Sequence, residues 1–491
     1  MIFISTRGKE KVSSASAAIT EGLARDGGLF VPEIFPDLSN MIEKMLSMDY
    51  YERAALVIGS YLDEYDKDEL LSACKKAYDK FDGDAAPTVK IDDNLYILEL
   101  FHGPTLAFKD IALTILPYLL RKGADHCGVK EDILVLVATS GDTGKAALEG
   151  FKDAEGIKIN VFYPTGGVSD MQKRQMCTQE GANVNVVGVN GNFDDCQTAV
   201  KRIFSDAKIN AELKENGYVL SSANSINFGR LVPQIAYYFS AYCDLVSSSE
   251  IKLGDKIDFV VPTGNFGNIL AGYYAKRMGL PINKLICASN SNNVLTEFFM
   301  TGKYDKNREF IKTVSPSMDI LVSSNLERLI FELSDRDPVL TASRMSDLNK
   351  TGSYDITEKE LKSLEKDFGS GYTEEEDCLQ EIQYFFDEYG YVLDTHTAVA
   401  MNVYDAEGDK KRPTVVLSTA SFYKFPQSVY YAIKGKKIKD AFAAADSLYK
   451  ETAAEIPQKI TELKEKPIKF DRTVDKDKVY SVVKDFTDST K

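Results

Sequence analysis

One lysine stands where a charged side chain is unexpected. Lys109 follows Leu106, Ala107 and Phe108 in FHGPTLAFKD, residues 101–110, and precedes the apolar run IALTILPYLL. A lysine amine that is partly removed from water has a lowered pKa and is a usable nucleophile at neutral pH. The alternative is a surface lysine whose stem lies along apolar neighbours while its ammonium group stays in water.

A glycine-containing loop joins a strand to a helix in IDFVVPTGNFGNILAGYYAKRM, residues 257–278. The loop consists of Gly264, Asn265, Phe266, Gly267 and Asn268. Backbone N–H groups in such a loop, together with the partial positive charge of a helix N-terminus, favour a phosphate. The alternative is an ordinary turn between a strand and a helix, and the GxGxxG spacing of dinucleotide-binding folds is absent.

A second strand-to-helix loop follows ILVLVA and consists of Thr139, Ser140, Gly141, Asp142 and Thr143. Gly144-Lys145 resembles part of a nucleotide phosphate loop, but that motif needs glycine at position 139 and Ser or Thr at position 146. The hydroxyl and amide groups suit a small carboxylate at a helix N-terminus. Helix capping by Ser140 or Asp142 is the competing explanation.

These features together favour one type of chemistry. A desolvated lysine and a separate phosphate site in the same chain are what a Schiff base to pyridoxal phosphate requires. The sequence therefore predicts a site for this cofactor.

Short apolar runs separated by helical segments must position these residues. The runs are 95–100, 133–138, 157–163, 183–189, 257–261, 284–289 and 413–418. Near-continuous apolar strands that alternate with helices predict an α/β fold with parallel sheets covered by helices. A turn-rich segment, FDGDAAPTVKIDDN, indicates a domain boundary near residue 90.

Composition argues against several classes of protein. The net charge of −15, without a basic cluster, disfavours binding to nucleic acid and to anionic membranes. The seven cysteines form no CxxC motif, and the three histidines form no cluster with ligand spacing, so we expect no structural metal. Because there is no long apolar segment and no signal-peptide core, we expect a soluble cytoplasmic protein.

Longer motifs make the chain resemble the threonine synthase family, which has the fold-type II architecture of pyridoxal phosphate enzymes. The motifs span nearly the whole chain: STRG, GLARDGGLFVPE, FHGPTLAFKD, TSGDTG, GNFDDCQTAV, SSANSINFGRLVPQ, VPTGNFGN, SPSMDILVSSNLERL and DTHTAV. The resemblance implies two α/β domains of the tryptophan synthase β-like type, an N-terminal domain and extra helices. We expect an N-terminal domain over 1–90, a large domain over 91–130 and 231–430, a small domain over 131–230, and a C-terminal helical segment over 431–491.

The resemblance also implies roles for individual residues. Lys109 would bond to the cofactor, the 264–268 loop would hold its phosphate, and Thr419, with Ser418 as second choice, would meet its ring nitrogen. The 139–143 loop would receive the substrate carboxylate. Asn224 and Arg230 would contact the substrate, with Arg230 at its phosphate. Alternatively, Asn224 caps a turn and Arg230 pairs with a surface acid.

The activity implied by the resemblance is conversion of O-phospho-L-homoserine and water to L-threonine and phosphate, by γ-elimination and β-addition, in a monomer or homodimer. One departure concerns the segment after Thr419, where the family commonly has TAHPAKF and this chain has TASFYKF, with Lys424 and Phe425 in register. His396 is kept in DTHTA, where DPHTA is usual. The alternatives are a related phospho-lyase that releases 2-oxobutyrate, a non-catalytic binding module of the same fold, and an enzyme that acts on nucleotide phosphates.

Overall fold

The larger of two parallel sheets carries the 264–268 loop. The computed structural model describes residues 1–8, 10–139, 141–166 and 168–488. In this sheet the strand order is β14-β11-β10-β15-β5-β4. The strands are β4 (Thr88–Asp92), β5 (Leu95–Glu99), β10 (Ile257–Pro262), β11 (Ile282–Ser289), β14 (Phe368–Tyr372) and β15 (Thr414–Ser418). Neighbours pair in parallel from β14 to β5, and only β4 runs antiparallel.

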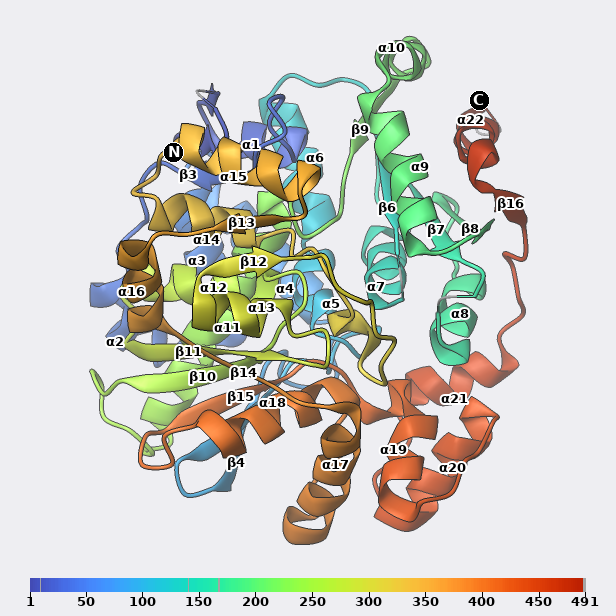
Figure 1. Cartoon of the computed structure of the whole chain (residues 1–491). Coiled ribbons are helices and arrows are strands. Elements are labelled where there is room, and N and C mark those ends of the chain that lie inside the picture. The colour runs from blue at the N-terminus through green and yellow to red at the C-terminus, as the bar shows by residue number, and fades with distance from the viewer. Residues whose placement is uncertain (9, 140, 167, 489–491) are drawn as a thin grey trace.

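Helices cover both faces of this sheet, as the apolar strands predict (Figure 1). One face packs against α11 (Phe228–Ser247), α12 (Gly267–Arg277) and α13 (Val294–Thr301). The other packs against α17 (Glu375–Tyr389), α18 (Thr395–Glu407) and α19 (Pro426–Lys434). Successive side chains of a strand point to opposite faces, so Phe259 and Val261 of β10 join the first core and Val260 joins the second.

The smaller sheet is wholly parallel in the order β16-β8-β7-β6-β9. Its strands are β6 (Asp132–Ala138), β7 (Ile157–Pro164), β8 (Val184–Asn190), β9 (Tyr218–Ser221) and β16 (Thr473–Asp475). It stands upright at the right of Figure 1, with α7 (Asp142–Phe151), α8 (Asp170–Cys177), α9 (Phe193–Ser205), α10 (Ala207–Glu215) and α22 (Val479–Asp488) around it. The α/β class with parallel sheets covered by helices is therefore confirmed.

The N-terminal residues form a small antiparallel sheet and a group of helices. The strands are β1 (Phe3–Ser5), β2 (Lys11–Val12) and β3 (Phe30–Pro32), and the helices are α1 (Ala15–Glu21), α2 (Ile42–Met45), α3 (Tyr50–Tyr61) and α4 (Lys67–Tyr78). Phe228 of α11 joins this part to the large sheet. Its ring centroid lies 4.6 Å from that of Phe3 and 5.4 Å from that of Tyr61.

Two further groups of elements complete the chain. One comprises β12 (Lys303–Asp305), η2 (Pro316–Met318), α14 (Leu326–Leu333), α15 (Pro338–Lys350), β13 (Ser353–Asp355) and α16 (Glu358–Asp367). After α19 come α20 (Ala441–Thr452) and α21 (Gln458–Glu465), and the chain then runs along the small sheet to β16 and α22 (Figure 1). The last 60 or so residues thus span both sheets, and they include a strand as well as the expected helices.

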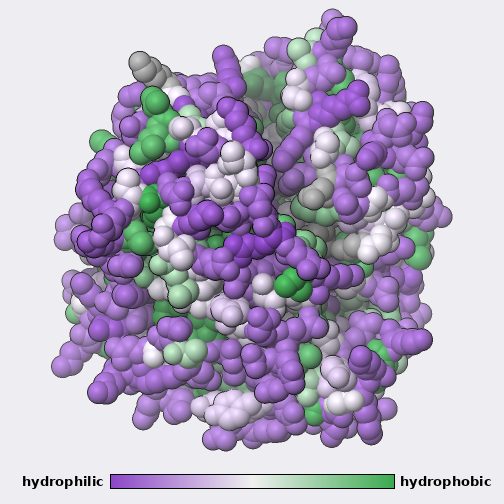
Figure 2. Space-filling model, in the orientation of Figure 1, coloured by the Kyte–Doolittle hydropathy of each residue, from purple (hydrophilic) through white to green (hydrophobic). Residues whose placement is uncertain are grey.

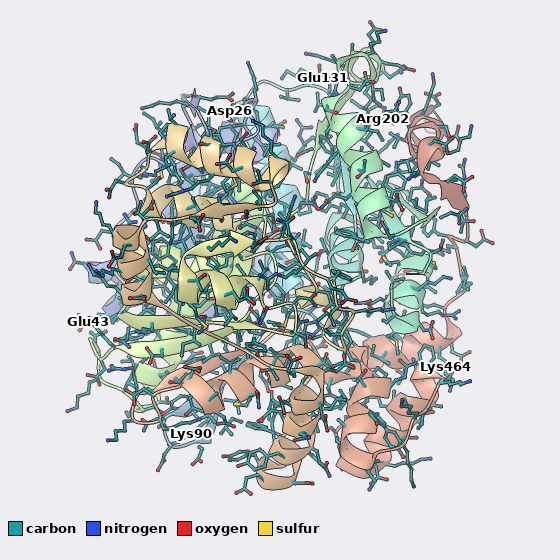
Figure 3. All side chains as sticks on the ribbon, in the orientation of Figure 1. Asp26, Glu43, Lys90, Glu131, Arg202 and Lys464 are labelled. Carbon is teal, nitrogen blue, oxygen red and sulfur yellow. The ribbon has the colours of Figure 1, made fainter. Side chains whose placement is uncertain are left out.

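Charged side chains lie mainly at the outside. Asp26, Glu43, Lys90, Arg202 and Lys464 are exposed and lie at the periphery in Figure 3. Figure 2 shows a mostly hydrophilic face, with a furrow between the side formed by the small sheet and the rest of the molecule. No helix of the described residues combines the length and the apolar character needed to cross a lipid bilayer.

Candidate active site

Lys109 begins the short helix α5 (Lys109–Leu113), and the loop before it is bonded to the segment after β15. The Phe108 N–H donates to the Thr419 carbonyl at 2.9 Å, and the Ser421 N–H donates to the Leu106 carbonyl at 3.0 Å. Leu106 has a φ of 62°, a left-handed conformation that costs a leucine about 1–3 kcal/mol. These contacts bring Lys109 and Thr419 to the same end of the large sheet.

The Lys109 amine is nearly buried and has two polar neighbours. Its side chain is 11% exposed, and Nζ lies 3.8 Å from Asp142 Oδ2. Nζ also donates to Ser317 Oγ at 3.3 Å. Burial lowers the pKa of Lys109 to about 8, because desolvation outweighs the opposing charge of Asp142. The sequence prediction of a sheltered amine thus agrees with the geometry.

Asp142 also binds a second buried lysine, Lys424. Lys424 Nζ lies 2.8 Å from Asp142 Oδ1 and donates to the Thr105 carbonyl at 2.9 Å. Gln172 Nε2 donates to the same Asp142 oxygen at 3.0 Å. Burial would raise the pKa of the Asp142 carboxyl, but Lys424 and Lys109 outweigh it and hold the pKa below its usual value. Asp142 is therefore an anion that joins α7 of the small sheet to the segment after β15.

The 264–268 loop has the form of a phosphate cradle. A Cβ on Gly264 would lie 2.6 Å from the Ser317 carbonyl oxygen, so only glycine fits there. The Ser323 hydroxyl donates to the Gly264 carbonyl at 2.7 Å, and Asn325 Nδ2 donates to the Asn265 carbonyl at 3.1 Å. The chain then enters α12, whose first-turn N–H groups have no acceptor within the helix. This is an arrangement that attracts an anion.

Asn268 leaves one buried donor unused in this cradle. Its Oδ1 accepts from Tyr237 at 2.5 Å and from Tyr238 at 3.1 Å, which fixes the side chain. Its Nδ2 is buried and has no hydrogen-bond partner among the described residues. A buried donor without a partner is costly unless a ligand supplies an acceptor. The cradle and the Lys109 amine therefore fit a phosphorylated aldehyde cofactor.

The loop between β6 and α7 has its free donors at a helix N-terminus. Thr139 Oγ1 accepts from the N–H groups of Gly141 at 3.0 Å and Gly144 at 2.9 Å, which fixes the turn. Ser140, which we also expected in this site, lies outside the described residues. Thr143 is half-buried. The Thr139 hydroxyl donates to the Gly141 carbonyl at 3.1 Å, and the Asp142 side chain is paired with Lys424. Among the described residues of this loop, backbone N–H groups and the Thr143 hydroxyl therefore remain for a carboxylate.

The residues at the end of β15 differ in how their hydroxyl groups are used. The Ser418 hydroxyl lies 3.1 Å from that of Thr397. The Thr419 hydroxyl has no hydrogen-bond partner among the described residues, and the residue is buried. Of the two hydroxyl groups, that of Thr419 is therefore the one free for a ligand, and its contact with the cofactor stays a prediction.

Arg230 and Asn224 lie where the small sheet meets α11. Arg230 is 5% exposed, and its Nη1 donates to the Ala223 carbonyl at 2.8 Å. It forms no ion pair within the described part of the chain, and desolvation lowers the pKa of its guanidinium to about 10. Asn224 is half-buried, and its backbone carbonyl accepts the Asn227 N–H at 3.1 Å. Its side chain has no hydrogen-bond partner among the described residues.

Sequence reasoning did not assign roles to Ser317, Asp394, His396 or Lys424, which also lie in or behind this site. Their motifs, SPSMD, DTHTA and SFYKF, were visible in the sequence. Only the folded chain shows that they meet Lys109 or its neighbours.

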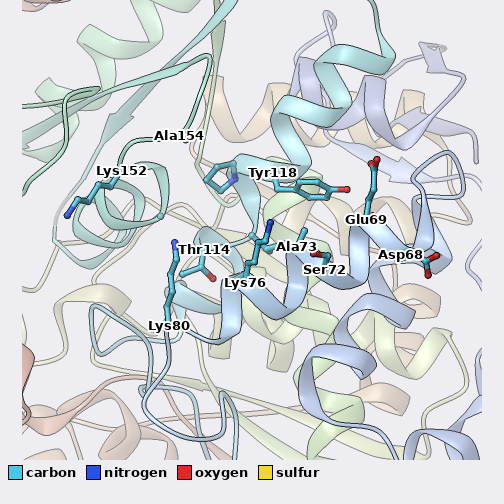
Figure 4. Close-up of a pocket in the computed structure, with 14 residues that line it drawn as sticks. Asp68, Glu69, Ser72, Ala73, Lys76, Lys80, Thr114, Tyr118, Lys152 and Ala154 are labelled. Carbon is cyan, nitrogen blue, oxygen red and sulfur yellow. The ribbon is translucent and has the colours of Figure 1, made fainter.

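A separate open cavity of about 720 Å³ lies between α4, the start of α6 (Leu116–His126) and the end of α7 (Figure 4). Lys76, Lys80, Thr114 and Tyr118 line it, and Lys109 does not. The cavity is therefore distinct from the site around Lys109.

Comparison with known sequences identifies three matching families. The family described as pyridoxal-phosphate dependent enzyme matches residues 85–420. Those described as threonine synthase N terminus and threonine synthase, C-terminal match residues 2–78 and 397–486.

Individual relatives agree with this result. Threonine synthase-like 1 of Homo sapiens is 43% identical over 468 residues, which are 89% of this chain and 61% of that protein. The chain thus spans about three fifths of the length of that relative. Threonine synthase of Saccharomyces cerevisiae (strain ATCC 204508 / S288c) is 36% identical over 467 residues, 88% of this chain and 89% of the yeast protein.

Among solved structures, threonine synthase from Brucella melitensis with bound pyridoxal phosphate superposes with a TM-score of 0.88 and 36% identity. The match covers 99% of this chain and 98% of that one. The chain therefore belongs to the threonine synthase family of pyridoxal-phosphate dependent enzymes.

Proposed function

We propose that this chain converts O-phospho-L-homoserine and water to L-threonine and phosphate. The observation that carries the proposal is the buried Lys109 amine, with a pKa of about 8, in a site that also contains the phosphate cradle. Two threonine synthases support it, because each is 36% identical to this chain and matches it over most of both lengths.

The cofactor, when bound, supplies an electron sink beside the amino-bearing carbon of the substrate. Lys109 would hold it through the amine, the 264–268 loop would hold its phosphate, and Thr419 would face its ring nitrogen. These assignments rest on the Asn268 Nδ2, which has no partner among the described residues, and on the hydrogen bond from the Phe108 N–H to the Thr419 carbonyl.

Lys109 then acts as the base and acid of the reaction. Because its pKa is about 8, the amine can both accept and return a proton near neutral pH. It removes the α-proton, releases it to solvent, and then removes the β-proton as phosphate leaves the γ-carbon. Lys109 gives that proton to the γ-carbon, and water adds its hydroxyl group to the β-carbon and its proton to the released phosphate. Lys109, protonated again by solvent, returns a proton to the α-carbon.

Arg230 and the 139–143 loop would orient the substrate. A guanidinium without a carboxylate partner suits a phosphate dianion, and we assign the substrate phosphate to Arg230. The backbone N–H groups at the start of α7 would receive the substrate carboxylate, with Thr139, Ser140 and Thr143 beside them. Asn224, where the small sheet meets α11, would supply a further side-chain amide to the substrate.

Product analysis tests the proposal. The purified protein, incubated with pyridoxal phosphate and O-phospho-L-homoserine, should release threonine and phosphate in equal amounts. Borohydride reduction followed by tryptic mapping should place the pyridoxyl mass on Lys109. As a matched control, Arg230→Lys should keep that mass on Lys109 and raise the KM for phosphohomoserine, because a lysine loses the bidentate contact.

A second candidate activity is release of 2-oxobutyrate, ammonia and phosphate from the same substrate. It is favoured by the SFYKF segment after Thr419, where the chain departs from the usual family sequence. If 2-oxobutyrate is the sole organic product, this second activity replaces the first. If no borohydride-sensitive absorption band forms with pyridoxal phosphate, the chain is a binding module instead.

We also propose that the protein acts in the cytoplasm as a monomer or homodimer, with domains divided at residues 90, 130, 230 and 430 as the sequence predicts. Cell fractionation, sedimentation analysis and limited proteolysis test these three points. Cleavage inside β6 or β10 before cleavage near these boundaries would contradict the division.

A further inference from the structure

We propose that Asp394 and His396 are positioning residues that hold Ser317 against the Lys109 amine, and that Ser317 is the neutral hydroxyl partner of this amine. The inference rests on the proposed role of Lys109. It is independent of which product the enzyme releases.

His396 is held in one tautomer by Asp394. Asp394 caps α18, and its Oδ1 accepts from the His396 backbone N–H at 2.9 Å and lies 3.0 Å from His396 Nδ1. A carboxylate can only accept, so Nδ1 carries the hydrogen. Nε2 is then the acceptor of a neutral imidazole, and it receives the Ser317 N–H at 3.2 Å. Asp394 is 1% exposed and His396 is 3% exposed, so water does not compete for these bonds.

Ser317 connects this pair to the site. It lies in η2, and its hydroxyl accepts from Lys109 Nζ at 3.3 Å. Its carbonyl oxygen is the atom that a Cβ on Gly264 would meet at 2.6 Å. One residue thus touches the reactive amine through its side chain and the candidate phosphate cradle through its backbone. Among the described residues, His396 Nε2 is the only acceptor of the Ser317 N–H.

The second oxygen of Asp394 extends the hydrogen bonds to the end of β15. Asp394 Oδ2 accepts from the Thr397 hydroxyl, which lies 3.1 Å from the Ser418 hydroxyl. Ser418 precedes Thr419, the candidate partner of the cofactor ring. Asp394 is therefore connected, through His396 and Thr397, to two segments that are far apart in the sequence.

A hydroxyl partner serves both states of the amine. Lys109 as an ammonium donates to Ser317 Oγ, and Lys109 as a neutral amine can accept from the same hydroxyl. Asp142, the other neighbour at 3.8 Å, attracts only the ammonium. Ser317 therefore keeps the amine in place through each proton transfer, which requires that the Ser317 segment itself does not move.

Two variants of His396 separate the bond to Ser317, which positions the site, from the bond to Asp394 at the start of α18. In His396→Gln the side-chain oxygen can take the place of Nε2 as acceptor for the Ser317 N–H. In His396→Asn the amide can replace only Nδ1, next to Asp394. We expect His396→Asn to lower kcat between about 10- and 100-fold, the range for small misplacement of a reacting group, with KM changed far less. His396→Gln should retain most of the rate.

A second measurement uses the full chain without cofactor. The rate at which pyridoxal phosphate becomes attached to Lys109, followed by borohydride quenching and peptide mass, should fall in His396→Asn and in Ser317→Ala. It should remain close to the unaltered rate in His396→Gln and in Ser317→Thr. This rate does not depend on the product, so the proposed function can fail while the positioning role stands, or the reverse.

A double variant completes the test. If His396 acts through the Ser317 hydroxyl, His396→Asn should have little further effect on kcat in a Ser317→Ala protein. Equal losses in the Asn and Gln variants, or full additivity with Ser317→Ala, would overturn the proposal in favour of a purely structural histidine. Should the His396 variants fail to fold, Ser317→Ala against Ser317→Thr decides alone, and equal attachment rates in these two proteins would overturn it.

Discussion

Lys109 and Lys424 are buried lysines that share one carboxylate, yet their surroundings differ. Lys424 is fully buried and lies 2.8 Å from Asp142, with the Thr105 carbonyl as a second acceptor. Lys109 lies 3.8 Å from the same carboxylate and has a serine hydroxyl as its other partner. The first arrangement is a close buried ion pair, and the second holds an amine whose pKa is lowered by desolvation.

The two lysines differ in their distance from the shared carboxylate. At Lys109 desolvation exceeds the attraction to Asp142 and lowers the pKa to about 8, whereas Lys424 forms a close, fully buried ion pair with Asp142. The geometry around the amine, a difference of 1 Å in one distance, separates a structural ion pair from a candidate catalytic group.

The largest expected effect comes from exchanging each lysine for arginine. Arginine keeps the positive charge but stays protonated, so it cannot act as a nucleophile. Lys109→Arg should lose the borohydride-sensitive absorption band and reduce turnover by about 10³-fold or more. Lys424→Arg should keep the band, because that position needs only a cation. Absorption spectra and product assays of the two proteins check this, and a band retained by Lys109→Arg would refute the distinction.

The next effect concerns stability. Lys424→Met leaves Asp142 buried without its close cation, and breaking a buried ion pair in this way costs about 3–5 kcal/mol. Adding Asp142→Asn removes the uncompensated charge and should restore much of the loss. The loss of stability and its restoration are measured from the urea denaturation midpoints of the single variant, the double variant and the unaltered chain. A double variant no more stable than Lys424→Met would show that packing, and not charge, causes the loss.

The smallest expected effect is a pair of opposite shifts in pH dependence. With a pKa of about 8, about a tenth of the Lys109 amine is neutral at pH 7, against about one part in three thousand at the usual lysine pKa. The rate of cofactor attachment should therefore rise with pH to a midpoint near 8.

The two neighbouring charges move this midpoint in opposite directions. Lys424→Met removes a cation that lowers the Lys109 pKa, so the midpoint should move to higher pH, by about one unit. Asp142→Asn removes an anion that raises this pKa, so the midpoint should move to lower pH. Attachment rates measured from pH 6 to pH 10 in constant ionic strength check the signs. Shifts of the same sign in both variants would contradict the electrostatic account.

Several strands could be predicted from the sequence to within a residue or two. The runs 133–138, 157–163 and 257–261 correspond to β6, β7 and β10. These strands are buried on both faces, so their sequences are continuously apolar. By contrast, β14, FGSGY, is not among the predicted apolar runs, and it becomes a strand because β11 supplies its partners.

The sequence by itself determined which residue types surround the candidate amine and form the two loops of the site. The apolar residues around Lys109, the glycines of the 264–268 loop and the hydroxyl groups of the 139–143 loop are local patterns, and local patterns carry their own physical meaning. They were sufficient to predict a reactive amine and a phosphate site, and both remain predictions.

Only the tertiary structure decided how these residues are paired. Asp142 meets Lys424, and His396 meets Ser317 across 79 residues, because strands of two sheets end at one site. Hydrogen bonds and ion pairs act over about 3–4 Å, whereas sequence patterns report only on neighbours along the chain. The partners of a buried amine, which set its pKa and its position, therefore emerge only when distant segments are packed together.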